Sequence, residues 1–174
     1  VQAVQTLSRL NRCYQGKDDT YVLDFVNDPD DVLNAFKTYY ATAQLSDVTD
    51  PNVVLNLRSK LDATGYYDEY EVERVVSVTL NPKAKQSQLE AAITPVADRL
   101  LKQFAAAKVA HAEATELKDE TSAKSAKDTM DALILFRTDL TTYLRAYTFL
   151  SQIFDYGNTD FEKRAIFFKY LIRL

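Results

Sequence analysis

The sequence is poor in the residue types that build metal centres and cross-links. Its 174 residues include one Cys (Cys13), one His (His111) and no Trp. A single Cys excludes an intramolecular disulfide framework and a Cys-based zinc cluster, and a single His excludes a multi-His metal site. We therefore expect no metal site in this chain.

Turn formers and long apolar runs are scarce as well. Three Gly and four Pro argue against a collagen-like chain and against an all-β fold with many tight turns. No stretch approaches the roughly 18 apolar residues of a membrane span, which excludes an integral membrane protein. Hydrophobic residues make up 47% and charged residues 26%, as in folded globular chains, and the length suggests about one domain.

The charge is mildly negative but unevenly distributed. Residues 1–82 hold 7 Lys and Arg against 13 Asp and Glu, whereas residues 83–174 hold 14 against 12. The net charge of −4 gives no general sign of nucleic-acid binding. The change in composition predicts a boundary near Pro82.

Both ends of the sequence are abrupt. The chain opens at Val1 without an initiator Met or a signal pattern, and an apolar helical pattern stops at Leu174 without a cap. We expect a segment of a longer protein, with a mature processed chain as the alternative.

Short elements fill the first half of the chain. Asp28-Pro29 and Asp50-Pro51 each combine a capping residue with Pro at the first helical position, so the Asp-rich starts are interpreted as helix caps, not metal clusters. The segment 68–80 is ambiguous between strand and helix, and we favour helix. The expected elements are helix 2–12, turn 14–19, strand 20–26, helix 29–44, helix 51–63 and helix 68–80.

Two apolar stripes of helical period dominate the second half. They run from Leu89 to Ala107 and from Leu133 to Phe154, and the polar run 111–131 joins them. This arrangement predicts an antiparallel helical hairpin with an exposed tip and arms of about 40 Å. Pro95 predicts a kink or a helix start.

A last helix is expected after a turn at 155–158. Thr159 and Glu162 have capping-box spacing, which places the helix start at Thr159. The basic side of this helix is a candidate for DNA phosphate contacts, with an ordinary surface as the alternative. Its members are Lys163, Arg164, Lys169 and Arg173.

Three polar residues near the start carry the clearest chemistry. Gln5, Arg9 and Arg12 are spaced by four and three residues, so they share one face of a helix. Two guanidiniums on one face form an anion receptor that suits phosphate oxygens. The alternative is an ordinary solvated helix surface. His111 and Cys13 are interpreted as a solvated helix residue and an ordinary, partly buried thiol.

The Gln-x3-Arg-x2-Arg pattern, followed by a predicted strand, resembles motif six of superfamily-two helicases and translocases. The segment 4–27 and the later run from Tyr147 to Gly157, followed by Glu162-Lys163-Arg164, resemble the R (restriction) subunit of type I restriction-modification enzymes. The resemblance extends from residue 4 to about 172.

The resemblance implies an ATP-driven motor that translocates double-stranded DNA, and a separate nuclease domain. Arg12 would be the arginine finger, Arg9 a second contact to the γ-phosphate, and Gln5 a positioning group. ATP and Mg²⁺ are the implied cofactors of the parent protein. The implied partners are double-stranded DNA and the methyltransferase and specificity subunits, in the cytoplasm of a bacterium or archaeon, with no membrane.

The expected fold is mainly α. It comprises a remnant of the second RecA-like lobe at 1–28, a helical linker region at 29–82 and a helical domain with a long hairpin at 83–174. The remnant strand has no partner strand in this chain, so its open edges favour self-association.

The chain departs from the family in lacking a phosphate loop, a Walker B pair and a placeable nuclease cluster. We therefore expect the segment alone neither to hydrolyse ATP nor to cut DNA. Two alternatives are open: part of another superfamily-two helicase or remodeller, and a helical interaction module without a catalytic part.

Overall fold

The computed structural model describes residues 12–19, 50, 52–152 and 154–173, and the single positions 23, 26, 28 and 31. This part of the chain is mainly helical, which confirms the expected fold class. Its helices are α3 (Asn52–Ala63), α4 (Glu69–Leu80), α5 (Gln86–Glu116), α6 (Glu120–Leu150) and α7 (Asp160–Leu171).

Some predicted elements lie outside the described residues. These are helix 2–12 except Arg12, nearly all of helix 29–44 and most of strand 20–26. Two positions of the predicted strand are described, Leu23 and Val26, and they are 80% and 91% exposed. Neither side chain therefore contributes to the buried core.

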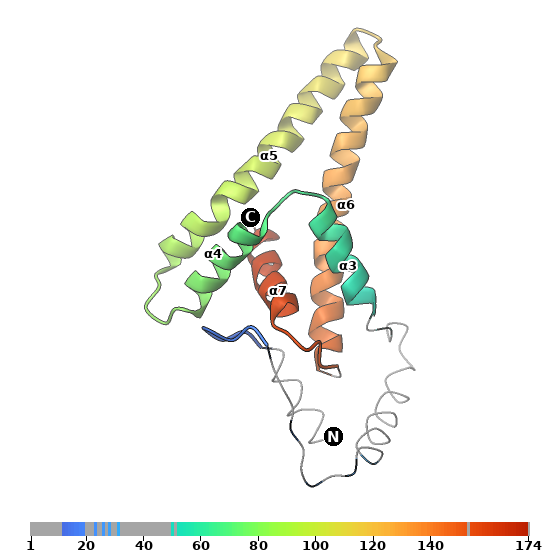
Figure 1. The fold of residues 1–174 in the computed structure, drawn as a ribbon. Helices are drawn as coiled ribbons and strands as arrows, with labels where there is room; N and C mark the ends of the chain where they lie inside the picture. The colour runs from blue at the N-terminus through green and yellow to red at the C-terminus, as the bar shows by residue number, and fades with distance from the viewer. Residues whose placement is uncertain are drawn as a thin grey trace.

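The longest helices form the frame of the molecule. Helices α5 and α6 have 31 residues each, about 46 Å at 1.5 Å per residue. They run in opposite directions from the turn at 117–119 and diverge away from it (Figure 1). Helix α7 fills the space between the diverging ends, α4 packs on α5, and α3 packs on α6.

The polar run 111–131 is helical except for the turn at 117–119. His111 is half-buried there, and its Nδ1 lies 2.9 Å from the carbonyl oxygen of Ala123 on the opposite helix. The expectation of a solvated His111 is wrong, because the ring connects α5 to α6 close to their turn.

Local capping explains where α3 and α4 begin. The side chain of Asp50 accepts a hydrogen bond from the backbone N–H of Asn52 at 2.9 Å, which confirms its predicted role as a cap. Asp68 and Glu71 form a reciprocal capping box at the start of α4. This box settles the ambiguous segment 68–80 as a helix.

Pro95 does not mark the start of a helix. Helix α5 begins at Gln86 and continues through Pro95, so the predicted helix start is wrong. Leu89, Ile93 and Val96 are buried on one face of the helix, while Pro95 is exposed on another. The buried face therefore continues across the proline.

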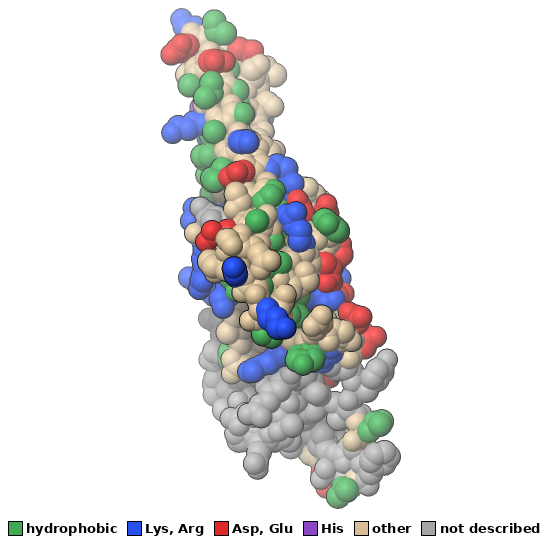
Figure 2. Space-filling view, turned by 90° about the vertical axis from the view of Figure 1, so that its left-hand side faces the viewer, with side chains coloured by type: hydrophobic (Ala, Val, Ile, Leu, Met, Phe, Trp, Pro, Cys, Tyr) green, Lys and Arg blue, Asp and Glu red, His purple; other side chains and the backbone are tan. Residues whose placement is uncertain are grey.

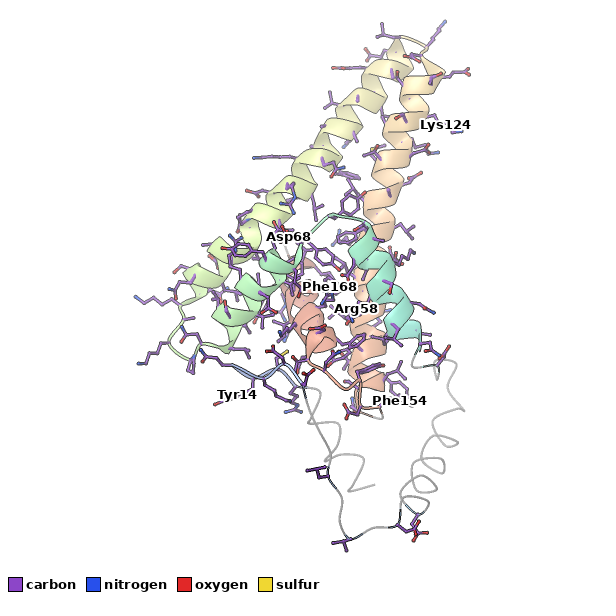
Figure 3. All side chains as sticks on the ribbon, viewed as in Figure 1. Tyr14, Arg58, Asp68, Lys124, Phe154 and Phe168 are labelled. Carbon is purple, nitrogen blue, oxygen red and sulfur yellow. The ribbon has the colours of Figure 1, made fainter. Side chains whose placement is uncertain are left out.

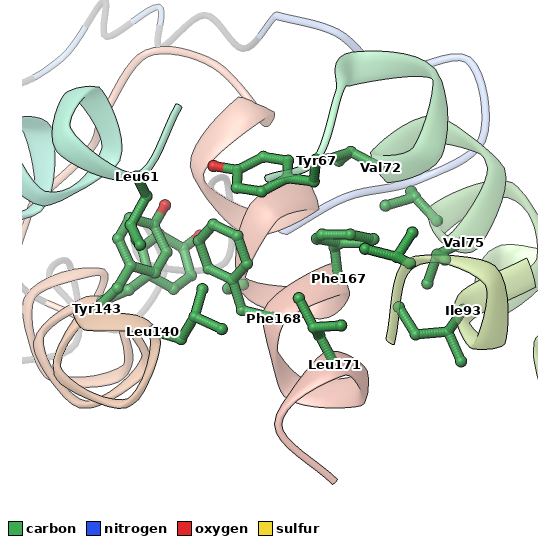
Figure 4. Close-up of a cluster of buried hydrophobic side chains, with 14 of the residues drawn as sticks. Leu61, Tyr67, Val72, Val75, Ile93, Leu140, Tyr143, Phe167, Phe168 and Leu171 are labelled. Carbon is green, nitrogen blue, oxygen red and sulfur yellow. The ribbon is translucent and has the colours of Figure 1, made fainter. Parts of the chain in front are cut away.

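Aromatic side chains of α6 and α7 form the centre of the core (Figure 4). Tyr143, Phe167 and Phe168 are fully buried, and the rings of Tyr143 and Phe168 meet edge to face with centroids 5.1 Å apart. The Tyr143 hydroxyl donates to the carbonyl oxygen of Phe161 at 2.8 Å. The same core spans both sides of Pro82, because six of its residues come from the first half of the sequence: Val54, Leu61, Tyr67, Val72, Val75 and Val76.

Candidate functional site

Of the three predicted phosphate-contacting residues, Arg12 is the one that lies within the described part of the chain. Its side chain is exposed. Gln5 and Arg9 lie outside the described residues, so the shared face of the three stays a prediction.

Arg12 begins a segment that we call the docked loop, residues 12–19. The Lys17 N–H donates to the Tyr14 carbonyl oxygen at 3.0 Å, and Gly16 has a φ of +78°, which gives a tight turn that suits glycine. The Lys17 side chain reaches back and donates to the carbonyl oxygen of Arg12 at 2.7 Å. The predicted turn is therefore confirmed, and it holds the backbone of Arg12.

The docked loop is fastened to the N-terminal end of α7. Figure 3 shows Tyr14 of this loop beside the base of α4, far from the Lys124 end of α6. The Thr159 hydroxyl donates to the carbonyl oxygens of Lys17 and Asp18 at 3.0 and 3.3 Å, and the Thr159 N–H donates to that of Asp18 at 3.1 Å. The Cys13 thiol donates to the Thr159 carbonyl oxygen at 3.4 Å. Thr159 thus holds both ends of the loop.

These contacts overturn the predicted capping box at Thr159. Helix α7 does begin there, but Thr159 makes no side-chain cap hydrogen bond. Its hydroxyl is fully buried against the loop and cannot serve the helix as well. Instead, the Asn158 side chain accepts the N–H of Asp160 at 3.1 Å.

A half-buried carboxyl lies beside the loop. Burial raises the pKa of Glu162, while hydrogen bonds from Cys13 and the charges of Arg12 and Lys17 oppose this rise. Its Oε2 is buried without a hydrogen-bond partner in the described structure. Burial, and then the charge of Glu162, raises the pKa of Cys13 to about 12, so the docked thiol is a poor nucleophile at neutral pH. The interpretation of Cys13 as an ordinary, partly buried thiol agrees with this environment.

The predicted basic side of α7 is not one continuous surface. Arg164 is 5% exposed and pairs with Asp62 at 3.0 Å and with Glu69 at 2.6 Å. Lys163 pairs with Asp18 of the docked loop at 3.1 Å and with Glu73 of α4 at 2.8 Å. Because these two cations are engaged inside the fold, their proposed phosphate contacts are wrong.

Lys169 and Arg173, the other two members of that basic side, are exposed. On the face of the molecule drawn in Figure 2, basic, acidic and hydrophobic side chains are interspersed over the body and along the α5–α6 arm. Two exposed cations on such a mixed surface give weak support for a DNA-binding face.

An apolar groove of about 280 Å³ is lined by residues of α5 and α6, together with Leu171 at the end of α7 and Ile172 after it. Leu101 and Ile134 contribute to its lining while remaining 58% and 54% exposed. Arg137 is the charged residue in the lining, and it is also exposed.

Within the described residues, no three His, Cys, Asp or Glu side chains are arranged to hold a metal ion. No helix in that same part of the chain combines the length and hydrophobicity needed to cross a bilayer. No family model, curated protein or solved structure matches this chain.

Sequence reasoning missed the role of Thr159. Its spacing to Glu162 is that of a capping box, and nothing in the sequence distinguishes a hydroxyl that caps its own helix from one that holds a distant loop. Lys17 and Thr159 are 142 positions apart in the sequence, which puts this contact beyond local pattern analysis.

Proposed function

We propose that this chain is a segment of the restriction subunit of a type I restriction-modification enzyme, an ATP-driven DNA translocase and endonuclease. In this proposal Arg12 is the arginine finger, Arg9 a second γ-phosphate contact and Gln5 a positioning group. ATP and Mg²⁺ are held mainly by residues outside this chain. Double-stranded DNA and the methyltransferase and specificity subunits are the partners, in the cytoplasm of a bacterium or archaeon.

The observation that carries the proposal is the placement of Arg12. Its side chain is exposed, as it must be to reach a phosphate held by another lobe, while its backbone is held by Lys17. A positioned cation stabilises the charge on a transferring phosphoryl group, whereas a freely moving one does so poorly. The docked loop fixes the backbone that carries the Arg12 side chain and joins it directly to the N-terminal end of α7.

The reading frame on both sides of the segment tests the proposal. We expect a phosphate loop and a Walker B pair upstream, with a nuclease cluster before them. The purified 174-residue chain should show no ATP turnover above a mock preparation. A complete reading frame without a phosphate loop would overturn the proposal.

The alternative is a helical interaction module, which the groove between α5 and α6 favours. Exposed Leu101 and Ile134 at a concave apolar surface are typical of a site that accepts side chains of a partner. Such a module needs no ATP, so it predicts that Arg12→Ala changes no activity of the intact protein, whereas Ile134→Asp abolishes partner capture.

A further inference from the structure

We propose that the N-terminal end of α7 positions Arg12, so that the helical domain controls when this residue reaches the phosphate. Thr159 is the positioning residue, and it acts through the docked loop. This inference rests on the proposed function, because it assigns a regulator to the same arginine.

The geometry fixes the loop close to Arg12. Cys13, the next residue, contacts the Thr159 carbonyl oxygen, and Lys17 both contacts the Thr159 hydroxyl through its own carbonyl oxygen and donates to the carbonyl oxygen of Arg12. The residues on either side of the tight turn are therefore tied to one buried threonine, Cys13 through its thiol and Lys17 through its backbone carbonyl. A displacement of Thr159 by the helical domain would move the backbone that carries Arg12.

A second tie joins the same loop to two helices. Lys163 donates to Asp18 of the loop and to Glu73 of α4, and it is largely buried. Lys163 and Thr159 lie one turn apart at the start of α7. Because both of them bind the docked loop, the loop moves together with this end of the helix. Any rearrangement between α4 and α7 reaches the loop through Lys163.

The coupling must be reciprocal. If Arg12 contacts the γ-phosphate only while the loop is docked, then bound ATP favours docking and undocking weakens the contact. Cys13 reports the state of the loop, since it is the one cysteine of the chain and its thiol is half-buried against Thr159 only when the loop is docked.

The test compares Thr159→Val with Thr159→Ser in the intact protein. Valine keeps the branched shape and removes the hydroxyl, whereas serine keeps the hydroxyl. Two quantities are measured: the rate of Cys13 alkylation by N-ethylmaleimide, followed on its own peptide by mass spectrometry, and the kcat and KM of DNA-stimulated ATP hydrolysis. Circular dichroism of the purified 174-residue chain checks folding. Asp18→Ala, which removes the side-chain acceptor of Lys163 at an exposed position of the loop, replaces Thr159→Val if that variant fails to fold, and the same direction of change is expected in both measurements.

We expect Thr159→Val to weaken docking about tenfold, the usual effect of one lost hydrogen bond. From a loop that is docked about half of the time, this roughly doubles the rate of Cys13 alkylation and lowers kcat about fivefold. The KM for ATP should stay within about twofold, because an arginine finger acts mainly in the transition state. Thr159→Ser should match the unmodified protein in both measurements, and a non-hydrolysable ATP analogue should slow alkylation.

Other results overturn the inference in distinguishable ways. Unchanged alkylation in Thr159→Val would show that the hydroxyl does not hold the loop. Faster alkylation with unchanged kcat would refute the positioning role, while a large loss of ATPase in Arg12→Ala would leave the proposed function standing. If Arg12→Ala itself leaves ATPase unchanged, both the proposed function and this inference fail.

Discussion

A single guanidinium, that of Arg164, joins three helices inside the fold. It pairs with Asp62 of α3 and Glu69 of α4, and Asp62 also accepts a hydrogen bond from the Tyr67 hydroxyl. Arginine suits this position because its planar fork serves two carboxylates at once, which a lysine ammonium cannot do with the same geometry. The residue therefore has a structural role, although its sequence position suggested a phosphate contact.

Arg164→Met should lower the free energy of unfolding by about 2–3 kcal/mol. Removing one member of a fully buried ion pair lowers the free energy of unfolding by about 3–5 kcal/mol. The effect is smaller here because the Asp62 and Glu69 side chains are 32% and 56% exposed, so water partly replaces the lost arginine. Urea unfolding followed by circular dichroism measures the change. Lys169→Met, at an exposed position of the same helix, is the control and should stay within about 0.5 kcal/mol. Equal stabilities for the two variants would contradict the structural role of Arg164.

The docked loop should become weaker at alkaline pH. Burial, and then Glu162, raises the pKa of Cys13 from 9.0 to about 12, while Lys163 and Lys17 oppose this rise. Docking therefore favours the protonated thiol: its contribution is complete below pH 9 and is lost as the pH rises towards 12.

Alkylation of Cys13 as a function of pH measures this effect. The rate should keep rising between pH 9 and 11 in the folded chain, whereas in the urea-unfolded chain it should level off above pH 9. A plateau near pH 9 in the folded chain would show that the thiol is not held in the docked position.

At the scale of elements, helix α4 shows how local signals decide a mixed sequence. Val75 and Val76 favour a strand, but Asp68 and Glu71 cap the segment as a helix. Glu71 also accepts two hydrogen bonds from Arg99 of α5, at 2.8 and 2.9 Å, so the cap is attached to the neighbouring helix.

Asp68→Ala should therefore destabilise the protein by about 1 kcal/mol, because the first N–H groups of α4 lose their side-chain acceptor. Asp68→Asn is the matched control, since an asparagine oxygen accepts the same hydrogen bond. Thermal unfolding of both variants gives the comparison, and an alanine variant as stable as the asparagine variant would rule out a capping contribution.

The helices were predictable from the sequence because their signals are local. The apolar stripes fall on α5 and α6, and Asp50 and Asp68 lie at helix starts. The pairing of Thr159 with Lys17 and that of Arg164 with Asp62 depend on contacts between distant segments. A sequence pattern gives the type of such a side chain but not its partner, so the candidate site was only partly predictable.

At the scale of the whole molecule, part of the uneven charge along the sequence is paired inside the described fold. The cations Arg99, Lys163 and Arg164 of the second half pair with carboxylates of the first half. The excess of acid before Pro82 therefore contributes to holding the two halves together. These ion pairs and the apolar core around α7 both join residues from the two halves of the sequence.

Phe168→Ala should test the central position of α7. The side chain is fully buried and lies against Tyr67 of the α3–α4 connection and Tyr143 of α6, so its loss leaves a cavity at the junction. We expect a loss of about 3–5 kcal/mol in urea unfolding. Phe149→Ala, at a position that is 38% exposed, is the control and should cost far less. Similar losses for both would contradict this view of the core.

The central claim, that Arg12 acts on ATP while the helical domain holds it in place, is tested most directly by DNA-stimulated ATPase of the intact protein. The account predicts that Arg12→Ala lowers the rate by roughly 10³-fold or more, with the fold and the affinity for DNA unchanged. Arg145→Ala, which removes an exposed guanidinium from α6, should leave the rate unchanged. An Arg12→Ala protein that hydrolyses ATP at the normal rate would contradict the account.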